Sequence, residues 1–171
     1  MDLRPTGIAV VGDKPWGTHF CHFYETRQDL LETLVPYFKA GLENKEFCLW
    51  IISPPLTEEE ARSALRQMLP ELDRYLVERS MEILPNDVWY LEGGVFDLHR
   101  ALNGWQEKLH EALARGYAGI RVTGDATGLQ KRDWRAFCEY ERELNDFAAK
   151  HPIIVLCAYP LARAEPLKSW M

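Results

Sequence analysis

Three residues near the start of the chain, His19, Cys21 and His22, carry side chains that bind metal ions or act in catalysis. On a β-strand, His19 and Cys21 share one face while His22 points to the other, so one strand offers two ligands to a site. Others would have to come from Cys157 or Cys48 on neighbouring strands. No CxxC or HxxxH spacing accompanies them. We therefore predict packed core residues and no metal, with His19, Cys21 and Cys157 as the alternative metal ligands. A catalytic Cys/His pair is not expected, because a residue in mid-strand cannot easily reach a substrate.

A second set of residues lies where the expected strands end, and each offers a polar tip or an aromatic ring. Parallel strands bring their carboxyl ends to one edge of the sheet, where ligands bind in open α/β sheets. We therefore expect one cavity to be lined by Tyr24, Glu25, Ser53, Trp89, Tyr90, Asp125 and Tyr159. The set holds aromatic rings, two carboxylates and the Ser53 hydroxyl, but no Lys or Arg. It favours a small neutral or cationic organic ligand.

Residues 85–96 show neither helical nor alternating periodicity, and they contain Trp89, Tyr90 and the pair Gly93-Gly94. We expect an irregular loop that closes over the cavity as a lid and becomes ordered when a ligand binds. Trp89 and Tyr90 in such a loop either cap the cavity or contact a partner protein, and the sequence does not separate these two roles.

The turn after the first strand argues against a nucleotide site. In nucleotide-binding proteins this turn is rich in glycine and ends in Gly-Lys-Ser/Thr, whereas residues 24–29 read Tyr-Glu-Thr-Arg-Gln-Asp. Asp125 stands where an ATPase keeps the acid that holds magnesium, but without that loop it has no phosphate partner. We predict that Asp125 is a polar residue of the cavity or a helix cap, and that the chain neither binds nor hydrolyses ATP or GTP.

Arg121 lies inside an otherwise apolar strand, where a guanidinium group is costly unless it is paired. Glu141 lies in apolar surroundings on the helix that follows, and we expect this helix to pack against the strand. We predict a structural ion pair between Arg121 and Glu141, in preference to a contact of Arg121 with a ligand.

The elements that must hold these residues alternate along the chain. Apolar runs predict strands over residues 18–25, 46–53, 81–84, 119–124 and 152–158. Apolar residues at helical spacing, with caps at Thr26, Thr57 and Asp97, predict helices over residues 27–40, 58–69, 71–79, 98–115 and 131–150. We expect an α/β fold, a three-layer sandwich around a mainly parallel central sheet. The strand at 18–25 reads as buried on both faces, at the centre of that sheet.

The composition limits the classes of partner. The formal net charge is −6 and no basic cluster is larger than residues 130–132, which argues against direct contact with nucleic acid or an anionic membrane. No apolar run is long enough to span a bilayer. Cys21, Cys48, Cys138 and Cys157 have no disulfide-framework spacing, so we expect reduced cysteines and a cytoplasmic protein.

Seven short motifs in order along residues 17–160 resemble the MEDS domain, the sensory domain of methanogen and methylotroph regulators. They are His19-x-Cys21-x-Phe23-Tyr24-Glu25, Gly41-Leu42, Glu46-Phe47-Cys48, Tyr90-Leu-x-Gly93-x-x-Phe96-Asp97, Gly116-Tyr117 with Gly119-x-Arg121, Tyr140-Glu141-x-x-Leu144-Asn145, and Leu156-Cys157-x-Tyr159. The resemblance implies a RecA/KaiC-like fold that lacks the phosphate-binding loop. It also implies an input domain of histidine kinases or transcriptional regulators that senses simple hydrocarbon derivatives.

We therefore expect a non-catalytic sensory domain over residues 17–160, preceded by an irregular lead-in at 1–16. Residues 161–171 would be a tail that joins an output domain. The expected partners are a small organic ligand and an output domain or partner protein, with a homodimer as a further option and no cofactor. The alternative is a protein-interaction module built on a RecA-like ATPase fold that has lost its activity. An enzyme is disfavoured by the turn at 25–29.

Overall fold

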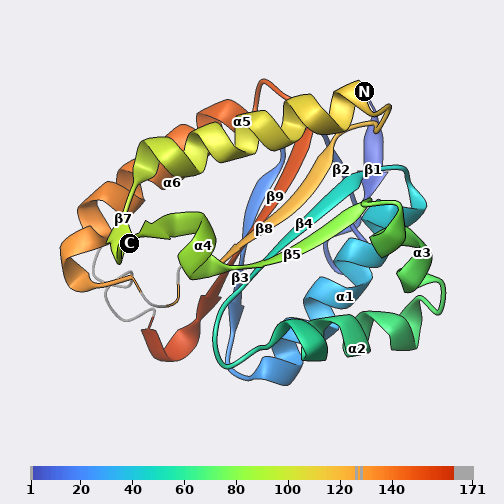
Figure 1. The fold of residues 1–171 in the computed structure, drawn as a ribbon, viewed down its shortest axis with the longest axis horizontal. Coiled ribbons are helices and arrows are strands. Elements are labelled where there is room, and N and C mark those ends of the chain that lie inside the picture. The colour runs from blue at the N-terminus through green and yellow to red at the C-terminus, as the bar shows by residue number, and fades with distance from the viewer. Residues whose placement is uncertain (1, 126, 128, 164–171) are drawn as a thin grey trace.

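The computed structural model describes residues 2–125, 127 and 129–163 (Figure 1). The strands are β1 (Leu3–Pro5), β2 (Asp13–Pro15), β3 (His19–Tyr24), β4 (Phe47–Ile52), β5 (Met81–Pro85), β6 (Leu91–Glu92), β7 (Val95–Phe96), β8 (Ile120–Asp125) and β9 (Ile153–Pro160). The helices are α1 (Arg27–Glu43), α2 (Glu58–Met68), α3 (Leu72–Val77), α4 (Asn86–Tyr90), α5 (Leu98–Ala114) and α6 (Trp134–Ala148), with short 3-10 helices at Lys131–Asp133 and Leu161–Arg163. Most of the expected C-terminal tail, residues 164–171, lies outside the described residues.

A parallel sheet of five strands, in the order β3-β9-β8-β4-β5, forms the middle of the fold. This confirms the expected mainly parallel sheet. The expected central position of the first strand is wrong, because β3 lies at one edge and Phe23 is 45% exposed. An edge strand that has helices over its faces can be as apolar as a central one, so composition alone did not place it.

Helices cover both faces of the sheet and complete the three-layer α/β sandwich (Figure 1). Side chains alternate between the two faces of a strand. Trp50 of β4 packs on the side that holds α1, α2 and α3, in one hydrophobic cluster with Leu34 and Leu65. The neighbouring Ile51 packs on the side that holds α4, α5 and α6, with Trp105. No helix within the described residues is both long and apolar enough to cross a membrane.

The predicted helix starts are confirmed by their caps. The Thr26 hydroxyl accepts a hydrogen bond from the backbone N–H of Asp29, whose carboxylate accepts one from the backbone N–H of Thr26. Thr57 and Glu60 make the same reciprocal pair at α2. The Asp97 side chain accepts a hydrogen bond from the backbone N–H of Arg100, the third residue of α5. Each cap satisfies backbone donors that the first helical turn leaves open.

Two segments that were expected to be irregular contain regular structure. Within residues 1–16, β1 and β2 form an antiparallel hairpin. Residues 85–96 contain α4 and the hairpin of β6 and β7, which turns at Gly93 and Gly94 with positive φ angles of 62° and 80°. Two consecutive positive φ angles favour a tight two-residue hairpin turn. These elements are too short to give a readable periodicity, which is why the sequence pattern missed them.

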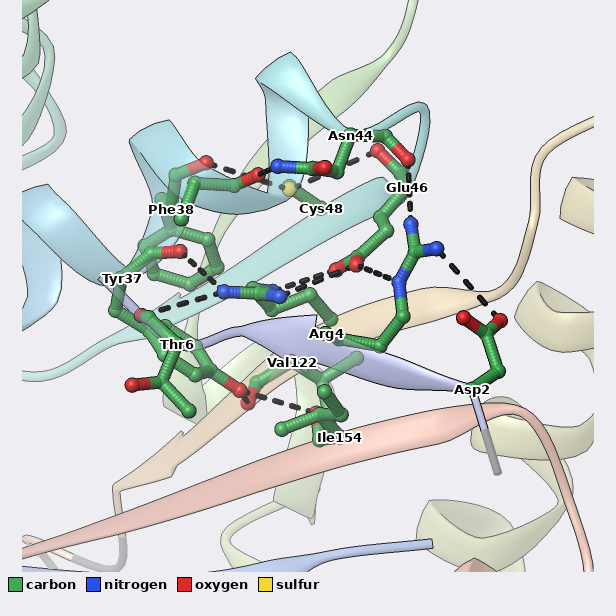
Figure 2. A network of polar contacts seen from close by, with 12 residues as sticks. Asp2, Arg4, Thr6, Tyr37, Phe38, Asn44, Glu46, Cys48, Val122 and Ile154 are labelled. Carbon is green, nitrogen blue, oxygen red and sulfur yellow. Dashed lines mark hydrogen bonds and ion pairs between the residues drawn. The ribbon is translucent and has the colours of Figure 1, made fainter. Parts of the chain in front are cut away.

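A buried ion pair joins β8 to the residue that precedes β4. The Nε atom of Arg121 lies 2.6 Å from Oε2 of Glu46, its Nη2 atom lies 3.1 Å from Oε1, and both side chains are 0% exposed. Glu46 also accepts a hydrogen bond of 2.9 Å from Nε of Arg4 (Figure 2). The remaining nitrogen of Arg121 donates to the backbone carbonyls of Tyr37 and Thr6.

The predicted ion pair between Arg121 and Glu141 is therefore wrong. Arg121 points to the face of the sheet covered by α1, where it approaches Tyr37. The helix α6, which carries Glu141, packs on the opposite face with its neighbour Tyr140 in the other hydrophobic cluster. The helix that follows β8 covers only one face of this strand. Side chains alternate between the two faces of β8, and that of Arg121 lies on the opposite face.

Gly41, which was expected to end the first helix, lies inside α1. A β-carbon at this position would lie 2.8 Å from Cδ of Arg121 and 2.8 Å from Sγ of Cys48. The glycine is therefore explained by the close passage of the Arg121 side chain beneath the helix.

Replacement of Arg121 by Met should lower the free energy of unfolding by about 3–5 kcal/mol, because Glu46 would remain buried without its bidentate partner. Denaturant unfolding followed by circular dichroism measures this change. Arg66→Met is the matched control, since Arg66 contacts Asp73 at the exposed surface and its removal should have a much smaller effect. Equal losses for the two variants would contradict a structural role for the buried pair.

Candidate functional site

The turn between β3 and α1 occupies the position of a phosphate-binding loop, but two of its backbone donors are already used. The Asp29 carboxylate accepts hydrogen bonds from the backbone N–H groups of Thr26, at 2.9 Å, and Glu25, at 3.2 Å. The hydrogen bonds with Thr26 are the main cause that holds the pKa of Asp29 below its usual range. Since the start of α1 carries its own carboxylate, a phosphate there would face a negative charge.

Tyr24 and Asp125 meet at the carboxyl edge of the sheet, although β3 and β8 are separated by β9. The Tyr24 hydroxyl donates to Oδ2 of Asp125 at 3.2 Å, and the backbone N–H of Thr127 donates to Oδ1 at 2.8 Å. Burial raises the pKa of the Asp125 carboxyl, and hydrogen bonds from Thr127, Ser53 and Tyr24 offset only part of that rise. The folded protein therefore favours the protonated form of Asp125 more than water does.

A small packing void adjoins Asp125 on the side of the sheet that α1 and α2 cover. No part of this void admits a water-sized sphere. The walls are mostly apolar, and they also include the buried hydroxyl groups of Ser53 and Thr123. Within the described part of the chain, the Thr123 hydroxyl has no hydrogen-bond partner, whereas the Ser53 hydroxyl lies close enough to Asp125 to lower the pKa of its carboxyl. The void thus combines an apolar lining with the unused hydroxyl of Thr123.

The expectation that all seven candidate residues line one cavity is wrong. Ser53 and Asp125 line the void, and Tyr24 reaches it through the Asp125 carboxylate. Tyr90 and Tyr159 pack in the cluster on the opposite face of the sheet. Tyr90 and Asp125 come close only across Gly124, where a β-carbon would lie 2.6 Å from the Tyr90 hydroxyl.

The two remaining candidates, Trp89 and Glu25, have different surroundings. Trp89 lies against Trp105 of α5, with ring centroids 4.4 Å apart, and a β-carbon at Gly104 would lie 2.9 Å from its ring. This packing makes Trp89 part of the contact between α4 and α5. The Glu25 side chain is exposed in the turn before α1. Strand ends meet at one edge, but the direction of each side chain decides which layer it enters.

A second cluster of functional side chains lies on the α6 side of the sheet. Nε2 of His19 is 3.1 Å from Sγ of Cys157 and 3.4 Å from Oε2 of Glu141, and Cys157 lies 3.5 Å from Oε1 of Glu141. The three ligand atoms all lie within 4.8 Å of one another. His19 and Cys157 belong to the alternative metal ligands of the sequence analysis, whereas Glu141 was assigned to Arg121. Its position one helical turn after Phe137, which packs against the sheet, is the signal that could have placed it here.

Cys21 lies directly beside Cys157 in the register of β3 and β9. Cys21 is exposed as a residue, but partial burial of its thiol, and then the Glu141 carboxylate, raise the pKa of that thiol to about 11. Burial is also the main cause that raises the pKa of Cys157. All four cysteines are free thiols, so neither Cys21 nor Cys157 is in a disulfide.

Comparison with known proteins links this chain to a sensory family and to a known fold. A family model described as "MEDS: MEthanogen/methylotroph, DcmR Sensory domain" matches residues 18–167. Among solved structures, the chain is similar to a KaiC-like protein from the hyperthermophilic archaeon Pyrococcus horikoshii OT3, with a TM-score of 0.62 and 16% sequence identity over 93% of this chain and 72% of that one. This likeness confirms the RecA/KaiC-like fold. The comparison with curated proteins gave no match.

The raised pKa of Asp125 has a measurable consequence for stability. The folded state holds the Asp125 proton more tightly than the unfolded state, so its stabilising effect is complete below about pH 4 and is lost as the pH rises through the folded-state pKa. The melting temperature of the wild type should therefore fall relative to that of Asp125→Asn as the pH increases from about 4 to 7.

The matched control is Asp73→Asn. The pKa of Asp73 is lowered by its hydrogen bond with Arg66, so the wild type should gain relative to this variant as the pH rises through the folded-state pKa toward about 4, and should gain no more above that. Differential scanning calorimetry in steps of pH measures both differences. A difference for Asp125→Asn that is constant with pH, or that has the sign of the Asp73 control, would show that the fold does not raise the pKa of Asp125.

Proposed function

The chain belongs to the MEDS family of sensory domains, and from this premise we propose that it is a non-catalytic ligand-binding module of a prokaryotic signal-transduction protein. Its ligand is a small neutral or cationic organic molecule of the class of simple hydrocarbon derivatives. Its output is a histidine kinase or a transcriptional regulator, joined to it or bound by it.

The observation that carries this proposal is the void beside Asp125. Apolar walls suit a small hydrocarbon group, while the Thr123 hydroxyl lacks a partner among the described residues. A protonated Asp125 can donate a hydrogen bond to an alcohol or a carbonyl, and a cationic ligand would favour its ionised form instead. Because the void admits no water-sized sphere, a ligand has to widen it, and only a small molecule fits without disrupting the core.

The start of α1 favours this reading over a nucleotide-binding one. The Asp29 carboxylate already uses the backbone N–H groups of Glu25 and Thr26. The residues around the void include no Lys or Arg that could pair with a phosphate. Both features are unfavourable for ATP or GTP at this edge of the sheet.

A chain of hydrogen bonds offers a route from the void to the surface. Asp125 accepts from the backbone N–H of Thr127, and the Thr127 carbonyl accepts from Nδ2 of Asn86 at 2.5 Å. Asn86 begins α4, which is followed by the hairpin of β6 and β7. Since these elements are already folded, we infer that ligand binding displaces them together and does not order a loop. Their movement would change the surface presented to an output domain.

The alternative function, a protein-interaction module, is favoured by two other observations. The void admits no water-sized sphere, and the expected cavity residues divide between two faces of the sheet. In addition, β3 is an edge strand that exposes Cys21 and Phe23, and an open edge can pair with a strand of a partner. In this reading, small molecules have no effect on the domain.

A thermal-shift screen separates the two functions. We expect at least one small alcohol, amine or halocarbon to raise the melting temperature in a concentration-dependent way, because it binds the folded state only. Magnesium with ATP or GTP should give no shift. Thr123→Val, which keeps the shape of Thr123 but removes its hydroxyl, should reduce the shift caused by the active compound.

Thr18→Val is the control, because the Thr18 hydroxyl bonds to a carbonyl outside the void and its loss should leave the ligand response unchanged. If no compound of these classes stabilises the protein, the sensory site proposed at Asp125 is wrong and the interaction module is preferred. Stabilisation by ATP that is lost when the turn at 25–29 is altered would overturn both.

A further inference from the structure

The cluster of His19, Glu141 and Cys157 has the dimensions of a metal-binding site. Around a tetrahedral zinc ion with a Zn–S bond of about 2.3 Å and Zn–N and Zn–O bonds of about 2.0–2.1 Å, the ligand atoms lie roughly 3.3–3.6 Å apart. Nε2 of His19 lies 3.1 Å from Sγ of Cys157 and 3.4 Å from Oε2 of Glu141, whereas Sγ of Cys157 lies 3.5 Å from the other carboxylate oxygen, Oε1. One ligand atom from each residue lies within 4.8 Å of the other two. A rotation of the Glu141 carboxylate would therefore let the imidazole, the thiolate and one carboxylate oxygen contact one ion.

The same geometry argues against a catalytic relay. In a Cys-His-carboxylate triad, the thiol and the carboxylate contact different nitrogens of the imidazole ring, so that a proton can pass through it. Here both Cys157 and Glu141 lie nearest to Nε2 of His19. Because the thiol and the carboxylate meet at the same nitrogen, their arrangement resembles that of ligands around one metal ion more than that of a proton relay.

The position of the cluster supports an ion that is held by protein groups. The side chains of His19 and Glu141 are only 7% and 21% exposed, and Cys157 is buried. The ligands come from β3, β9 and α6, so they are held by three separate elements of the fold. Within the described residues, no Lys or Arg forms an ion pair with Glu141, although a partly buried carboxylate favours a positive partner.

We propose that His19, Glu141 and Cys157 bind one divalent transition-metal ion, with zinc as the best match. A thiolate and an imidazole favour zinc and its transition-metal neighbours over magnesium or calcium. Three protein ligands leave a fourth position for water or another small ligand. The bound ion ties this edge strand and α6 to β9. The inference does not depend on the ligand proposed at Asp125, which lies on the other face of the sheet.

The test uses the reduced chain after removal of metals with a chelator. Titration with zinc in competition with a chromophoric chelator should give one site per chain. Titration with cobalt should give an absorption band for charge transfer from a thiolate, together with the visible bands of a tetrahedral ion. Zinc should also raise the melting temperature.

Two pairs of variants locate the site. Glu141→Gln and Cys157→Ser should weaken zinc binding by at least about tenfold, since even groups outside the ligand shell change metal affinity by about 10–100-fold. Glu139→Gln and Cys138→Ser alter exposed residues of the same helix and should bind zinc as the wild type does. If Cys157→Ser does not fold, Glu141→Gln decides, because its side chain lies at the edge of the helical layer and keeps its shape.

The proposal is overturned if cobalt gives no thiolate band. It is also overturned if Cys138→Ser lowers the affinity as much as Cys157→Ser, since the metal would then bind adventitiously at the surface. Unchanged zinc affinity in Glu141→Gln would likewise remove the carboxylate from the site.

Discussion

The buried pair of Arg121 and Glu46 is the constraint on which the rest of the fold depends. Two ionised groups at 0% exposure are tolerated only when every donor has an acceptor, and here the acceptors come from distant parts of the chain. Arg121 reaches the carbonyls of Tyr37 and Thr6, so α1 and the N-terminal segment must lie where they do. Gly41 follows from the same requirement, because the helix has to pass close above the guanidinium.

The alternation of the strands explains why the sequence predicted the fold better than the site. Long apolar runs and helix caps predicted the order of the strands and helices, because each of these signals lies within a few neighbouring residues. The burial of β4 and β8 on both faces, however, removes the pattern that tells one face from the other. Arg121 was therefore paired with Glu141 on the wrong layer, and Tyr90 and Tyr159 were placed beside Asp125. Such assignments depend on contacts between residues far apart in sequence, which apolar composition does not record.

The carboxyl edge of the sheet differs from that of a nucleotide-binding protein in more than the loss of glycines. Asp29 supplies an anion from the chain itself, and it satisfies the donors that a phosphate would otherwise use. The hydroxyls of Ser53 and Thr123 lie among apolar side chains. This edge therefore offers a phosphate less than the corresponding edge of a nucleotide-binding protein does.

The hairpin of β1 and β2 lies before the region that matches the family, yet its segment of the chain contacts the buried ion pair. The family match begins at residue 18, whereas Arg4 provides the second cation next to Glu46 and Thr6 provides a carbonyl to Arg121. A fragment trimmed to the matched region would keep the buried acid and base but lose both of these neighbours. The first residues of the chain therefore complete the polar surroundings of the ion pair, and a boundary set by the family match alone would remove them.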